Sequence, residues 1–170
     1  MTKLDRKGFA GCTRILAYVL GISAFYPIFL LGASIGMELP MKPIALFWGI
    51  VKLAMAYAVI CVYRSTKEVK TALVGVLLAS SGIFSFLSVP LFLASATEAL
   101  AITGLSLVLF DLGKVLPALG MDIPAGLIFL GVVFSILNSP TMNFVGLVAL
   151  LAGLLLSSVR VRKIKAVGTG

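Results

Sequence analysis

The chain has 170 residues, of which 61% are hydrophobic and 12% are charged, and its mean hydropathy is +1.17. An average soluble domain has about 25% charged residues, so this composition excludes an ordinary water-soluble fold and indicates a protein of the lipid bilayer. The formal net charge of +8 does not indicate a nucleic-acid partner, because clusters of basic residues flank the first and last apolar runs, where topology signals lie.

The first apolar run covers residues 15–36 and is longer than the apolar region of a secretory signal, so we expect a retained membrane span. Pro27 lies inside it and predicts a kink, because proline has no backbone N–H to donate. Gly32 and Gly36 are four residues apart, a spacing that would let another helix pack closely.

The second run, residues 44–63, is long enough to cross about 30 Å of hydrocarbon as a helix, and Lys52 lies well inside it. Trp48 precedes Lys52 by one turn. We expect Trp48 at the outer interface in an aromatic belt, with a contact between its ring and Lys52 as the alternative. The charged loop 64–70 follows, and we expect it to be cytoplasmic.

The third run extends over residues 71–96 and is expected to tilt or to bend at Pro90. Ser81, Ser85 and Ser88 recur along it at helical spacing. Small hydroxyl side chains on one face more often mark a helix–helix contact than a pore lining, so they are candidate packing residues, with a polar pathway as the alternative.

The fourth run covers residues 99–119, and two further runs cover 124–138 and 142–159. A single helix over 124–159 would be about 54 Å long, so this stretch must be two helices or a re-entrant hairpin. With both tails basic, the positive-inside rule favours six spans over five.

These runs predict an all-α fold, an integral membrane helical bundle of about six transmembrane helices with short loops, forming one domain over residues 1–170. We expect it in the cell membrane with both termini in the cytoplasm.

Charge inside the apolar runs is the sharpest signal. Each unpaired charge in the middle of a bilayer costs at least about 2.5 to 3.5 kcal/mol, so Lys52 needs a partner. The depths of Lys52 and Asp111 differ by about 8 Å, and we predict that they pair. Lys114 is three residues after Asp111, so a pair within that helix is the alternative, as is a charge on another subunit. Lys52, Asp111 and Lys114 form the candidate charge cluster, whereas Glu98 and Asp122 lie at span ends, where solvated charges are ordinary.

Motifs for catalysis are missing from the sequence. It contains no histidine, no phosphate-binding loop and no metal-spaced cysteines, which predicts no catalytic, metal or cofactor site and no enzyme activity. Cys12 and Cys61 are both expected near the cytoplasmic side, so we interpret them as reduced packing residues. The scarcity of asparagine and the absence of glutamine fit a thermophile.

These features favour a cofactor-free accessory or structural subunit of a larger membrane complex, such as a respiratory or other energy-transducing complex. Its expected partners are the lipid bilayer and other membrane subunits. The alternative is a small transporter or ion channel acting as a homo-oligomer, with Lys52 and Asp111 near the path of the substrate.

Overall fold

The computed structural model describes residues 6–37, 40–87, 90–137 and 139–163. Over these residues the chain forms helices and no strand, which confirms the predicted all-α helical bundle. The elements are α1 (Arg6–Ser23), α2 (Phe25–Ser34), α3 (Met41–Thr66), α4 (Val69–Phe84), α5 (Leu91–Val115), the short 3-10 helix η1 (Pro117–Leu119), α6 (Asp122–Ile136) and α7 (Pro140–Arg162).

Four helical runs in the described part of the chain are long and apolar enough to cross a membrane. They are Phe9–Ser34, Lys42–Arg64, Phe92–Val115 and Pro140–Arg162. Helices α4 and α6 are shorter, with 16 and 15 residues, or about 24 and 22 Å of helix. The fold is therefore that of a membrane protein in which only four of the six expected spans have full length.

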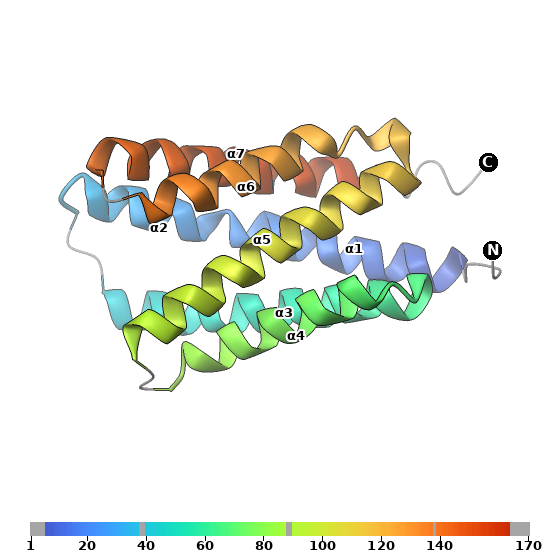
Figure 1. Cartoon of the computed structure of the whole chain (residues 1–170), viewed down its shortest axis with the longest axis horizontal. Coiled ribbons are helices and arrows are strands. Elements are labelled where there is room, and N and C mark those ends of the chain that lie inside the picture. Colours follow the sequence, from blue (N-terminus) through green and yellow to red (C-terminus); the bar gives the residue numbers. More distant parts are fainter. Residues whose placement is uncertain (1–5, 38–39, 88–89, 138, 164–170) are drawn as a thin grey trace.

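The helices form a closed ring in chain order. If α1 and α2 are counted as one helix, each helix runs antiparallel to the one before it (Figure 1) and packs against the next. The last helix, α7, packs on α1 and closes the ring. The N-terminal end of α1 and the C-terminal end of α7 lie at the same end of the bundle as the turn between α3 and α4 (Figure 1). We call this the basic end, because Arg64, Arg160 and Arg162 lie in the last turns of α3 and α7 there.

Prolines mark the start of the three helices that run back toward the basic end. Pro40 and Pro90 are the N-cap residues of α3 and α5, and Pro140 is the first residue of α7. A proline is tolerated at a helix start because the N–H that it lacks has no partner within the helix there. We call this opposite end of the bundle the proline end.

The predicted boundary between the third and fourth spans is wrong. The sequence indicated spans at 71–96 and 99–119, but α4 ends at Phe84 and α5 begins at Leu91. The chain stays apolar through the turn, so hydropathy does not detect it, and Pro90 begins a helix instead of bending one.

The first span is interrupted close to Pro27, where the sequence predicted a kink. Helix α1 ends at Ser23 and α2 begins at Phe25. Within an unbroken helix the carbonyl of Ser23 would accept a hydrogen bond from residue 27, and Pro27 has no N–H to donate.

Gly36 follows the end of α2 and does not pack against another helix, which corrects the packing prediction for Gly36. It has a φ of +87°, and a Cβ added to it would meet no atom within 4 Å. Its N–H donates to the carbonyl of Ala33 at 3.2 Å, and the N–H of Met37 donates to the carbonyl of Gly32 at 3.1 Å. These two bonds form a Schellman motif, which requires a left-handed residue at this position.

Other glycines make the closest helix contacts. A Cβ added to Gly146 of α7 would lie 2.9 Å from the carbonyl oxygen of Gly131 in α6, and one added to Gly82 of α4 would lie 3.1 Å from the carbonyl oxygen of Gly49 in α3. The α3–α4 and α6–α7 hairpins therefore pack backbone against backbone.

Candidate functional site

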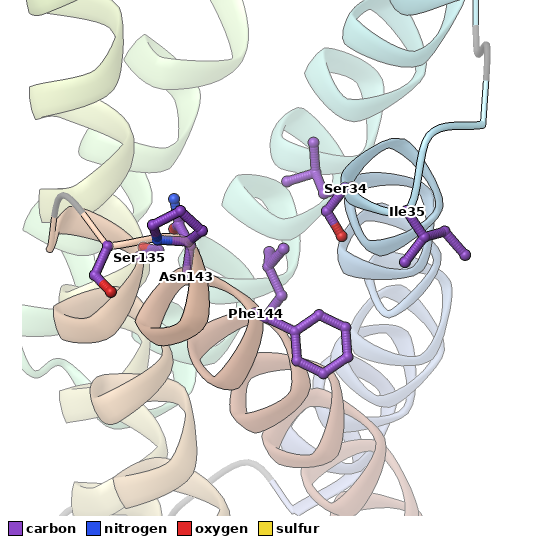
Figure 2. Close-up of a pocket in the computed structure, with 9 residues that line it drawn as sticks. Ser34, Ile35, Ser135, Asn143 and Phe144 are labelled. Carbon is purple, nitrogen blue, oxygen red and sulfur yellow. The ribbon is translucent and has the colours of Figure 1, made fainter.

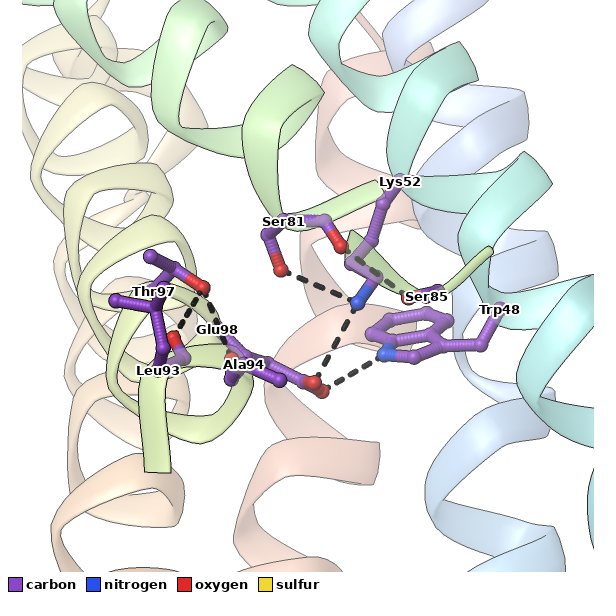
Figure 3. Close-up of polar contacts among 8 residues, drawn as sticks. All are labelled: Trp48, Lys52, Ser81, Ser85, Leu93, Ala94, Thr97 and Glu98. Carbon is purple, nitrogen blue, oxygen red and sulfur yellow. Dashed lines mark hydrogen bonds and ion pairs between the residues drawn. The ribbon is translucent and has the colours of Figure 1, made fainter. Parts of the chain in front are cut away.

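Lys52 lies inside the bundle and not at a lipid-facing position, with only 2% of its surface exposed. Figure 3 shows its side chain extending from α3 toward α4 and α5. Its Nζ donates a hydrogen bond to the hydroxyl of Ser81 at 3.1 Å and forms an ion pair with the Oε2 of Glu98 at 3.4 Å. The buried charge is thus compensated within the chain.

Glu98 is the acidic partner of Lys52, and its side chain is 30% exposed. Its Oε1 accepts a hydrogen bond from the indole Nε1 of Trp48 at 2.7 Å, so the two carboxylate oxygens have different partners (Figure 3). Because α5 begins at Leu91, Glu98 lies about two turns inside the helix and not at the end of a span.

Two aromatic residues complete the site. Trp48 is 3% exposed and its ring stacks on that of Tyr26 in α2, with centroids 4.1 Å apart and planes 2° from parallel. The Nζ of Lys52 lies 5.8 Å from the centroid of the Trp48 ring. The expected aromatic-belt position of Trp48 is therefore wrong, and the alternative, a contact with Lys52, is confirmed.

These residues form one group, which we call the polar cluster: Tyr26, Trp48, Lys52, Ser81 and Glu98. They come from α2, α3, α4 and α5. The rise of 1.5 Å per residue places Lys52 about 17 Å from the start of α3 and Glu98 about 11 Å from the start of α5. The cluster therefore lies inside the bundle, in the half nearer the proline end.

The predicted pairing of Lys52 with Asp111 is wrong. Asp111 pairs with Lys114 at 3.4 Å, the alternative that their spacing allowed, and the two side chains are 48% and 63% exposed. Asp111 lies about 20 Å along α5 from Glu98, beyond the reach of a lysine that touches Glu98. The three residues of the candidate charge cluster belong to two separate sites.

The three candidate packing serines of the third run have different positions. Ser81 is buried and binds Lys52, whereas Ser85 follows the end of α4, and its Cβ would lie 3.0 Å from a Cβ added to Gly49. Both residues contact α3. Ser88 is outside the described residues.

A pocket of about 300 Å³ opens at the basic end between α1, α3, α4 and α5. Thr71, Asp111 and Lys114 are among the polar residues of its lining. Between this pocket and the polar cluster, α3 and α5 carry the buried hydroxyl of Ser106 and, among other residues, four apolar side chains with no exposed surface. We call these four apolar residues the apolar plug: Met55, Val59, Leu105 and Leu109.

A second cleft, of about 610 Å³, lies at the proline end between α2 and the α6–α7 hairpin. Figure 2 shows Ser34, Ser135, Asn143 and Phe144 around it. The hydroxyls of Ser34 and Ser135 donate to backbone carbonyls of their own helices, so they are already partnered. We assign no ligand to this cleft.

Cys12 and Cys61 form a disulfide between α1 and α3, which corrects their interpretation as reduced packing residues. The two helices are antiparallel neighbours, and the cysteines lie at matching heights near the basic end with their Cα atoms 5.4 Å apart. This separation lies within the range that a disulfide bridges. Sequence reasoning missed the bond because it weighed the expected compartment above the matching positions of the two residues.

No protein-family model, curated protein or solved structure matches this chain.

Proposed function

We propose that this protein is a small membrane carrier for a cation and that Glu98 is the residue that binds it. One observation supports this proposal above others: Lys52 and Glu98 form a charged pair between two candidate membrane spans, in which the side chain of Glu98 is 30% exposed and that of Lys52 is buried. Charged residues inside membrane segments are costly and most often mark the path of an ion or substrate.

The surroundings of the pair support the same function. Carriers hold their substrate near the middle of the membrane and open to one side at a time. Here the apolar plug separates the polar cluster from the pocket at the basic end. Such a barrier on one side of a charged site is what alternating access needs, and a continuous polar channel would have none.

The accessory-subunit expectation loses one of its supports. It rested in part on charges inside the apolar runs without an obvious full set of partners, and the structure pairs Lys52 with Glu98 and Asp111 with Lys114. We therefore put the carrier, the alternative in the sequence analysis, first.

Reconstituted liposomes would test the carrier function. The reconstituted protein is given an inward gradient of H⁺, Na⁺ or methylammonium, and uptake is followed with a pH dye inside the vesicles or with the radiolabelled ion, so that transport without net charge movement is also detected. We expect uptake of at least one probe that Glu98→Gln abolishes and that Asp122→Asn, at the exposed start of α6, leaves unchanged. Absence of uptake for all probes, or uptake that Glu98→Gln does not change, would overturn the proposal.

We also propose that the basic end faces the cytoplasm of the cell, so that both termini are cytoplasmic. The positive-inside rule supports this orientation, because three arginines, Arg64, Arg160 and Arg162, lie at the basic end and outnumber Lys42, which lies exposed at the proline end. The disulfide near the basic end is compatible with it because Cys12 is buried inside the bundle, where the bond is shielded from cytoplasmic reductants. In a variant without the native cysteines, Lys163→Cys should react with an impermeant maleimide only in inside-out vesicles and Lys42→Cys only in right-side-out vesicles. The reverse pattern would refute this orientation.

A further inference from the structure

The ammonium group of Lys52 occupies a place built for a cation. A carboxylate oxygen of Glu98, the hydroxyl of Ser81 and the face of Trp48 surround it. A carboxylate with an aromatic ring is a combination that recognises organic ammonium ions, and the hydroxyl adds an acceptor for one of their N–H groups.

The carboxylate stays in position without the lysine. Its Oε1 is held by Trp48 at 2.7 Å, a tight bond, while the Oε2 is 3.4 Å from the Nζ of Lys52. Tight charge-assisted bonds between an ammonium and a carboxylate are about 2.7 to 2.9 Å long, so the contact with Lys52 is the looser of the two. One oxygen is therefore fixed and the other is able to exchange its partner.

We propose that the site takes a primary alkylammonium ion and that Lys52 is its tethered competitor, which loses one proton when the substrate binds. This inference rests on the proposed carrier function and names its substrate class. As the N–H···O contact of Lys52 with Glu98 is replaced by one from the substrate, an N–H bond of the Lys52 ammonium breaks and its proton passes to water.

Charge balance is the reason for the proton. Glu98 and Lys52 give the site one negative and one positive charge. Adding a second cation to a buried site of low dielectric is unfavourable, whereas release of the lysine proton keeps the net charge of the site at zero. One cation is thus exchanged for one proton, and the exchange carries no net charge across the membrane when each travels the opposite way.

Trp48 is the only tryptophan in the chain and lies in the site, so its fluorescence reports binding directly. In detergent at low buffer strength, methylammonium should change the Trp48 emission in a saturable way and release one proton per bound ion, measured with a pH dye. Tetramethylammonium, which has no N–H to donate to Ser81, should do neither. A methylammonium response without proton release, or an equal response to tetramethylammonium, would overturn the inference.

Variants at Lys52 make the test sharper. Lys52→Met removes the competitor, so methylammonium should bind at least about tenfold more tightly and without proton release. Lys52→Arg retains the ion pair but cannot lose a proton, so it should abolish the response while the protein stays folded by circular dichroism. Lys114→Met, at an exposed lysine, is the matched control and should behave like the wild type. Binding that survives Lys52→Arg would overturn the inference.

The two proposals fail in different ways. Methylammonium binding with proton release but without uptake into liposomes, measured with radiolabelled methylammonium under a pH gradient, would support the ligand assignment and refute the carrier function. Uptake of H⁺ or Na⁺ that depends on Glu98, without methylammonium binding, would support the carrier and refute the assigned ligand.

Discussion

Removing Glu98 alone should lower the free energy of unfolding more than removing both Glu98 and Lys52, because the single substitution leaves a buried charge without its ion-pair partner. Glu98→Gln leaves a charged lysine that is 2% exposed with only Ser81 and an aromatic face as partners, which costs about 3–5 kcal/mol of unfolding free energy. Lys52→Met costs less, about 1–2 kcal/mol, because Glu98 keeps its bond to Trp48 and is 30% exposed. The double variant removes both charges and should cost only about 1–2 kcal/mol.

The expected coupling energy between the two substitutions is therefore about 4 kcal/mol. It is measured by unfolding the four proteins with sodium dodecyl sulfate in mixed micelles, followed by far-UV circular dichroism so that Trp48 does not bias the readout. The pair Asp111 and Lys114 is the control, because both side chains are about half exposed or more and should couple by less than about 1 kcal/mol. Additivity within about 0.5 kcal/mol at Lys52 and Glu98 would refute the reasoning.

Three further predictions concern stability. Gly146→Ala should lower the unfolding free energy by about 1–3 kcal/mol, because its Cβ would lie 2.9 Å from the α6 backbone, whereas Gly126→Ala, with no atom within 4 Å, should be neutral or stabilising in the same detergent titration; equal effects would contradict this. Gly36→Ala should lower the thermal midpoint through a cost of about 1–2 kcal/mol for its φ of +87°, and an unchanged midpoint would show that the left-handed turn is dispensable. Reduction of Cys12–Cys61 should cost about 2–4 kcal/mol, and maleimide counting should find two thiols only after dithiothreitol; thiols that react beforehand would argue against the bond.

The fold was predictable because apolar length and charge position act over whole segments. A run such as 44–63 specifies a membrane helix whatever its neighbours are, and α3, from Met41 to Thr66, contains it. The turn at Pro90 was not predictable from hydropathy, since the residues on both sides of it are equally apolar. The shortness of α4 follows from that turn.

The site was predictable only in part. Lys52 is evident in the sequence because a charge in the middle of an apolar run has a cost that some other group must offset. Its partner was missed because Glu98 was assigned to a solvated span end, and the error in the boundary near Pro90 moved it there. Once α5 begins at Leu91, the same depth argument selects Glu98 over Asp111.

The ion pair connects helices that are not adjacent in the ring. Helix α4 lies between α3 and α5 and packs against both of them. Glu98 and Lys52 join these two helices across the ring, and Ser81 ties the intervening α4 to the same ammonium. Loss of Lys52 therefore removes the bond from α3 to Ser81 of α4 as well as a favourable electrostatic contact, whereas the bond from Trp48 to Glu98 still joins α3 to α5. A carrier that exchanges this ammonium for that of a substrate would keep the carboxylate occupied throughout, with Trp48 and Glu98 still joining α3 to α5, and Ser81 of α4 would lose its bond to α3 only while the substrate is bound.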